Sequence, residues 1–246
     1  MYNNVFGYWN VAAGQQSLFS NTSGYGNSAN GYQSLYGNTT GFNNSGLGSF
    51  SNVSSGTLSN ATAIGYGASV NASNKVRLGN SSVTVVEGAS YSTSDGRFKT
   101  NVKENAPGLD LIMQLKPVTY NFQYNKFSEF LKEHDPDKKF LTQRESVKEM
   151  GFIAQDVESA CRELGIEVSN ILHVPESEND NYSLAYQNLV VPLVKAVQEQ
   201  QQIINEQKAV IDDLKRSMDD QFKSMQGRID ALMQAMNNKM ASADKK

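Results

Sequence analysis

The sequence is poor in the residues that build disulfide frameworks and metal sites. It has one cysteine and two histidines among 246 residues. The single thiol, Cys161, excludes an intrachain disulfide and any zinc site made of several cysteines. His134 and His173 lie far apart, and no carboxylates are spaced to complete a metal site around either ring. We therefore expect no metal ion and no cofactor.

Long apolar runs and an excess of basic charge are also missing. No run approaches the roughly 18 apolar residues of a membrane span, and no basic region followed by an apolar stretch marks a secretion signal. The formal net charge is −3 and the isoelectric point is near 5.5, whereas nucleic-acid binding needs a basic surface. We expect neither a membrane nor a nucleic acid as partner. The start within a repeat favours a fragment of a longer chain.

The composition changes along the chain, which predicts separate architectures joined end to end. Residues 1–90 are rich in Gly, Asn, Ser and Thr, whereas the last part is rich in Gln, Met, Lys and Asp and has no proline after Pro192. We predict a mixed fold: a trimeric β-solenoid or β-roll over 1–90, a small α/β domain over 94–188, and a trimeric α-helical coiled coil over 189–240.

A repeat of 17 residues runs through the first part. Several columns keep this period, and they contain glycine, alanine, leucine or asparagine: Gly14, Gly31, Gly48 and Gly65; Gly7, Gly24 and Gly41; Ala12, Ala29, Gly46 and Ala63; Leu18 and Leu35; Asn21 and Asn38; Asn27 and Asn44. Units this short cannot close a core alone, so neighbouring units must stack. Tyr32–Leu35 and Ala61–Ile64 are the predicted strand pieces, separated by glycine and asparagine turns. A disordered linker is the alternative, and the aromatic and aliphatic columns oppose it.

These units resemble the head repeats of trimeric autotransporter adhesins and of phage fibres, although 17 residues is not the commonest period there. Asn-x-Ser/Thr triplets recur within them, and turn chemistry explains these without glycosylation.

The composition changes again at Ser94, and the following elements are expected to be short. A strand is expected at 82–86, a helix over 109–115, a strand over 117–124 and a short buried strand at 150–154. Residues 125–148 are charged and are interpreted as a solvent-exposed insertion. Val157, Ala160, Cys161 and Leu164 share one helical face, so Cys161 is expected to be a core residue rather than a nucleophile.

Four motifs occur in a fixed order in this part: Ser94-Asp95-Gly96-Arg97-Phe98-Lys99, Leu115-Lys116-Pro117-Val118-Thr119-Tyr120, Gly151-Phe152-Ile153-Ala154-Gln155-Asp156-Val157, and the stretch from Tyr182 to Gln200. Together they resemble the C-terminal intramolecular chaperone domain of phage tailspikes and tail fibres, the peptidase S74 family. The resemblance spans about residues 94–205.

The resemblance implies a domain that trimerises, templates the folding of the fibre ahead of it, and then cuts itself off through a Ser–Lys dyad. The matching positions are Ser94 and Lys99, and the scissile bond is Thr93–Ser94. Asp95 and Arg97 are candidate supporting residues. The implied enzyme is a single-turnover autoproteolytic serine peptidase with no activity on external substrates.

The Ser94–Lys99 pair can react only under certain chemical conditions. A serine hydroxyl needs a base to take its proton, and lysine is a base only when neutral, which requires burial or nearby positive charge. Arg97 and Lys103 are close enough in sequence to supply such charge. A serine and a lysine five residues apart are by themselves commonplace solvated residues, so the dyad depends on the other three motifs.

The last part has a heptad pattern. Val190, Val197, Ile204, Ile211 and Met218 occupy position a, whereas position d holds Leu193, Gln200, Gln207 and Leu214. Phe222, Met225, Ile229, Leu232 and Met236 continue the pattern after a four-residue stutter. A single amphipathic helix packed on its own domain is the alternative. The number three comes from the family resemblance.

Two functions follow from these features. The first is a trimerisation and folding module with self-cleavage; the alternative is a non-cleaving structural module of a host-binding tail fibre or a surface adhesin. The expected partners are two further copies of the chain and a host-surface receptor, and the expected location is a virion tail fibre or a bacterial cell surface. A conventional enzyme that acts on a small substrate is not supported, because the sequence contains no second group of candidate catalytic residues.

Overall fold

The computed structural model describes residues 2–88 and 92–243, with side chains through residue 238. The chain divides into two compact units, which are described separately. The first comprises residues 1–103 and 114–188, and the second comprises 104–113 and 189–246.

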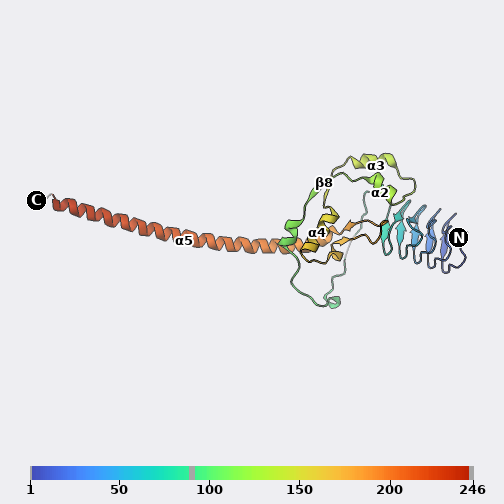
Figure 1. Ribbon diagram of the computed structural model, residues 1–246, viewed down its shortest axis with the longest axis horizontal. Coiled ribbons are helices and arrows are strands. Elements are labelled where there is room, and N and C mark those ends of the chain that lie inside the picture. Colours follow the sequence, from blue (N-terminus) through green and yellow to red (C-terminus); the bar gives the residue numbers. More distant parts are fainter. Residues whose placement is uncertain (1, 89–91, 244–246) are drawn as a thin grey trace. The chain divides into compact units, whose positions relative to one another are not determined.

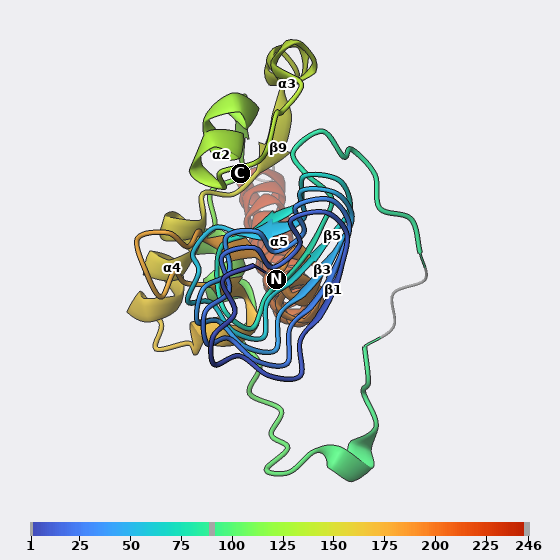
Figure 2. The ribbon, with the colours of Figure 1, turned by 90° about the vertical axis from the view of Figure 1, so that its right-hand side faces the viewer.

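The first unit begins with a β-solenoid, which confirms the predicted fold of the repeat. Its main sheet has five parallel strands in the order β1, β2, β3, β5, β7. The strands are β1 (Val11–Ala13), β2 (Ser28–Asn30), β3 (Ser45–Leu47), β5 (Thr62–Ile64) and β7 (Val76–Leu78), and a second pair is formed by β4 (Asn52–Val53) and β6 (Ser69–Val70). Figure 2 shows β1, β3 and β5 lying over one another.

Successive rungs keep the 17-residue period until the last one. Val11 pairs with Ser28, Ser28 with Ser45 and Ser45 with Thr62, but Thr62 pairs with Val76, only 14 residues later. The last rung is therefore three residues shorter than the others.

The 17-residue period places side chains against their own equivalents in the next rung. Asn38 donates to the Oδ1 of Asn21 at 2.8 Å, and Asn21 donates to Asn4 at the same distance. Gly31 has a φ of +133°, and a Cβ there would lie 2.6 Å from the backbone of Gly48. Glycine is required in this column because any side chain would collide with the next rung.

The positions of the strands differ in part from those predicted. Ala61–Ile64 is confirmed, since β5 covers Thr62–Ile64, but Tyr32–Leu35 is a turn. Gln33 and Leu35 there have φ of 53° and 49°, which a strand cannot contain. The predicted strand at 82–86 is also wrong, because these residues form a turn followed by irregular chain.

The rest of the first unit is built from short helices and two small antiparallel sheets. β8 (Val118–Tyr120) pairs with β9 (Glu149–Gly151), and β10 (Leu172–His173) pairs with β11 (Ser183–Leu184). The helices are η1 (Gly96–Phe98), α2 (Tyr124–Phe130), α3 (Lys138–Glu145), α4 (Ala154–Glu163), η2 (Val168–Asn170) and η3 (Tyr186–Leu189), whose last residue belongs to the second unit.

Residues 125–148 are a solvent-exposed insertion only in part, because most of them are exposed but three are core residues. Ser128, Leu131 and Leu141 in this range are at most 1% exposed. Conversely, the predicted strand at 150–154 is not buried, because Met150 is 85% exposed. Cys161 on α4 is fully buried, as predicted, and burial raises the pKa of its thiol.

The second unit contains a short helix and a very long one. α1 (Leu109–Gln114) lies where a helix was predicted, and its first backbone N–H donates to the Oε2 of Glu199 at 2.8 Å. α5 (Val190–Ala243) is one continuous helix of 54 residues, with Pro192 in its first turn as predicted (Figure 1). No helix among the described residues is long and apolar enough to cross a membrane.

Candidate functional site

Ser94 lies just before a tight turn that its own sequence stabilises. Asp95 is the N-cap of η1, and its carboxylate accepts from the backbone N–H of Arg97 at 2.9 Å. The backbone N–H of Lys99 then donates to the carbonyl of Gly96 at 3.1 Å and ends the turn. Aspartate is a preferred residue at this position because it satisfies a free N–H at the start of a helical turn.

The turn brings the two predicted dyad residues together. The Nζ of Lys99 donates a hydrogen bond to the Oγ of Ser94, and the two atoms lie 2.8 Å apart. This is the distance that a base needs in order to take a proton from a hydroxyl. Both side chains come from the same chain.

Asp95 and Arg97 hold the turn through each other. The Nη2 of Arg97 lies 2.6 Å from the Oδ2 of Asp95, and its Nε donates to the same carboxylate. The hydrogen bonds from the Arg97 side chain and backbone lower the pKa of Asp95, and the same pairing raises the pKa of Arg97. The charge of Arg97 is thus neutralised by Asp95, and this ion pair stabilises the turn between Ser94 and Lys99.

The environment of the pair is open in the single chain. Ser94 and Lys99 are both exposed, and Phe98 between them is 77% exposed. A lysine becomes a base by losing its charge, and this requires burial or positive neighbours. The geometry of the dyad is therefore present in one chain, whereas the burial that the chemistry requires is not.

The segment that leads to Ser94 is anchored at its start by Arg144 of α3. The Nη1 of Arg144 donates to the carbonyl oxygens of Ser81 and Val83, at 2.9 and 3.2 Å. Its guanidinium lies over the ring of Tyr124, 3.9 Å from the centroid. Sequence reasoning missed this anchor, because Arg144 is one of many charged residues in a region interpreted as solvent-exposed.

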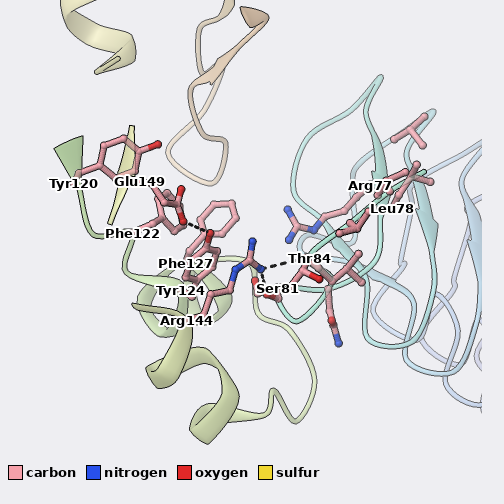
Figure 3. A pocket seen from close by; sticks show the side chains of 15 residues that line it. Arg77, Leu78, Ser81, Thr84, Tyr120, Phe122, Tyr124, Phe127, Arg144 and Glu149 are labelled. Carbon is pink, nitrogen blue, oxygen red and sulfur yellow. Dashed lines mark hydrogen bonds between the residues drawn. The ribbon is translucent and has the colours of Figure 1, made fainter. Parts of the chain in front are cut away.

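Arg144 also lines a cavity of about 490 Å³ beside the last rung of the solenoid (Figure 3). One wall comes from β7 and residues 80–86, and the other comes from aromatic residues on and around β8 and α2. The Tyr124 hydroxyl donates to Glu149 at 2.6 Å. Burial and this hydrogen bond raise the pKa of Tyr124 to about 12. Neither Ser94 nor Lys99 lines the cavity, so it belongs to the anchoring of the segment and not to the dyad.

A metal centre is not evident in the described part of the chain. No group of three or more histidine, cysteine, aspartate or glutamate side chains lies close enough together there to hold an ion.

Residues 94–166 match the sequence model of the peptidase S74 family, the chaperone of endosialidase. The predicted resemblance is confirmed. The match begins at Ser94 and supports an intramolecular chaperone role for this segment. Its end at Ile166 lies before the last of the four motifs, so the predicted span to residue 205 is matched only in part. Neither the search of curated proteins nor the search of solved structures found a match.

Proposed function

We propose that the chain is a homotrimeric intramolecular chaperone that folds a β-solenoid fibre and then cuts itself between Thr93 and Ser94. The observation that carries the proposal is the hydrogen bond from Lys99 to Ser94 at the first residue of the family match. In this proposal the chain acts on itself once and on no external substrate.

The trimer rests on the apolar stripe of α5. Its predicted core positions are largely uncovered in the single chain: Ile204, Ile211, Leu214, Met218 and Phe222 are 48–68% exposed. At 1.5 Å per residue the helix is about 80 Å long. Such a helix gains its stability by burying the stripe against other helices. A heptad pattern fits identical helices as partners, and the family resemblance sets their number at two further copies of the chain.

Templating follows from the order of the parts. A solenoid folds slowly because several rungs must be in place before their contacts stabilise one another. A downstream trimer holds three solenoid chains at high effective concentration and aligns their registers. The helix therefore assembles the chains, and the solenoids fold next to one another afterwards.

Cleavage proceeds through an acyl shift in this proposal. Lys99 takes the hydroxyl proton of Ser94, and the Oγ attacks the carbonyl carbon of Thr93. The bond from that carbon to the Ser94 nitrogen breaks, and Lys99 returns the proton to the leaving amine. Water then hydrolyses the ester, which leaves a carboxylate on Thr93 and a free hydroxyl and amine on Ser94. Attack by a serine on its own preceding bond needs no bound substrate.

Trimer formation supplies what the single chain lacks. Neighbouring copies that cover the exposed turn would remove water from Lys99 and favour its neutral form. Cleavage would then occur only after assembly.

The test is a denaturing gel of freshly expressed protein. Wild type is expected to give fragments of 93 and 153 residues, while Ser94→Ala, Lys99→Ala and Lys99→Arg stay at 246 residues. Ser92→Ala and Lys148→Ala are matched controls, because they change an exposed serine and an exposed lysine outside the dyad and are expected to cleave. An intact wild-type chain in a verified trimer would refute the cleavage step.

The second candidate is a non-cleaving trimerisation module of a tail fibre or surface adhesin. The length of α5 favours it, because the helix continues to Ala243, far beyond the family match, and would serve a permanent assembly. In both proposals the solenoid carries any receptor-binding surface, on a virion or a bacterial cell.

A further inference from the structure

The last rung of the solenoid is covered by two segments from beyond Ser94. One segment is residues 128–134, which comprise the end of α2 and the residues after it, and the other is residues 173–183, which run from the end of β10 to the start of β11. Each segment brings one buried carboxylate to a basic residue of the last rung.

The first carboxylate is Glu133, whose side chain is 1% exposed. It accepts from the Nη2 of Arg77 on β7 at 3.0 Å, and from the backbone N–H and the hydroxyl of Ser81 at 3.0 and 2.9 Å. Ser128 donates a further hydrogen bond at 2.9 Å. Both carboxylate oxygens are thus bound, mostly by groups of the solenoid.

The second carboxylate is Asp180, whose side chain is also 1% exposed. It accepts from the Nζ of Lys75 at 2.9 Å and pairs with the Nε2 of His173 at 2.6 Å. Beside it, the Nδ2 of Asn71 donates to the carbonyl of Asn179 at 2.8 Å and to the side chain of Asn181 at 3.0 Å.

Further contacts extend the same surface. Ser69 donates to the carbonyl of Leu131, and Lys132 donates to the carbonyl of Ser54 at 3.0 Å. The ring of His134 stacks on Phe50, with centroids 3.5 Å apart. In every one of these pairs the solenoid partner precedes the Thr93–Ser94 bond and the other partner follows it.

We propose that the C-terminal product of cleavage stays bound to the solenoid as its end cap, held by the Arg77–Glu133 and Lys75–Asp180 pairs. The proposal rests on the proposed function for the cut itself. The bond at Thr93 is not part of the contact surface, so cutting it removes none of these interactions. The reaction then breaks the covalent link between the cap and the solenoid, and the noncovalent contacts keep the cap bound.

Two physical arguments favour retention. The end of a solenoid exposes unpaired backbone groups and apolar surface, and repeat proteins need a capping element there. Separation would also break the hydrogen bonds that the two carboxylates accept from Arg77, Ser81 and Lys75. Hydrogen bonds between charged groups are among the stronger ones in proteins.

The test uses an external cut, so that it does not depend on self-cleavage. A recognition sequence for a site-specific protease is inserted between Val86 and Glu87 in the full-length Ser94→Ala chain. After complete cutting, verified on a denaturing gel, the mixture is analysed by size-exclusion chromatography with light scattering. We expect the two fragments to elute together at the mass of the uncut assembly, also in 1 M salt, because buried pairs are screened much less than exposed ones. Separate elution of the fragments would overturn the proposal.

Variants then test the two pairs. Glu133→Gln and Asp180→Asn keep the shape of each side chain, and we expect each to speed fragment dissociation by about ten- to hundredfold. Glu129→Gln and Glu178→Asn change exposed carboxylates in the same two regions and are expected to leave dissociation unchanged. Equal dissociation of all four variants would show that the buried pairs do not hold the cap. Circular dichroism of the uncut variants checks that they fold, and Arg77→Met and Lys75→Met repeat the measurement from the solenoid side.

The two proposals fail in different ways. Fragments that co-elute at the mass of one chain keep the cap and refute the trimer. A wild-type chain that never cuts itself refutes the dyad, and the externally cut chain still decides whether the cap remains.

Discussion

The Nζ of Lys99 lies 2.8 Å from the Oγ of Ser94 within one chain, across a turn of five residues. The two side chains therefore meet within one chain. In the proposed trimer the second and third copies would add burial, so the geometry of the pair and its activation would have separate origins.

An intrachain dyad predicts no complementation between chains. In mixed trimers of Ser94→Ala and Lys99→Ala chains carrying different tags, each chain lacks one half of its own dyad. We expect no cleaved product on a denaturing gel. Mixed trimers of wild type and Ser94→Ala are the control, in which the wild-type chains are cut. Cleavage of the Lys99→Ala chain in the first mixture would show that the lysine acts on a neighbouring chain.

The apolar stripe on α5 predicts a trimer that a charged substitution within the stripe weakens. Ile211→Lys puts a charge at a core position in all three copies. It also removes the stabilisation from burying the isoleucine side chain, about 2 kcal/mol per chain. We expect the trimer to dissociate at higher protein concentration in sedimentation experiments, and self-cleavage to fall with it. Asp212→Lys changes the neighbouring residue outside the predicted core and is the matched control. A trimer equally stable in both variants would contradict the assigned register.

The asparagine columns predict a stability defect inside the solenoid. Asn38 is fully buried, donates to Asn21 and the carbonyl of Gly41, and accepts from Asn44. Asn38→Ala removes three hydrogen bonds inside the solenoid, and we expect a loss of about 2–4 kcal/mol in the free energy of unfolding. Asn30→Ala, at an exposed position on β2, is the control and is expected to change it by less than about 0.5 kcal/mol. Chemical denaturation of the Ser94→Ala chain measures both.

Asp180 predicts how the cap responds to acid. Burial raises the pKa of Asp180, but hydrogen bonds from Lys75, His173 and two backbone N–H groups outweigh it and lower the pKa from 3.8 to about 2. A carboxyl with a lowered folded-state pKa stabilises the fold above its unfolded pKa and loses this contribution as the pH falls through the folded value. We expect about 2 kcal/mol to be lost between pH 4 and pH 2. Asp180→Asn is expected to flatten this part of the pH profile of unfolding, and Glu178→Asn is expected to retain it.

Some of this architecture could be read from the sequence because it repeats or has a strong period. The glycine column from Gly14 to Gly65 gave the rung length, and the apolar spacing after Val190 gave α5. The strands themselves were harder to place, because β2 is only Ser28–Asn30, three small residues with little strand preference. The turn at Gln33 and Leu35 contains larger residues and resembled a strand more closely.

The cap could not be predicted because its contacts are distant in sequence. Glu133 lies in a charged stretch, and its basic partner Arg77 precedes it by 56 residues. Nothing local marks this glutamate as buried, and only the fold brings the two residues together. The dyad was the opposite case, since both of its residues lie in one short motif.

The short last rung marks the end of the solenoid. Each 17-residue unit contacts only its neighbours, so a unit could be added or removed without altering the others. The last rung holds the basic partners of Glu133 and Asp180, which are Arg77 and Lys75. The number of rungs and the way the last rung is covered are thus encoded independently, and one terminal module would fit solenoids of many lengths.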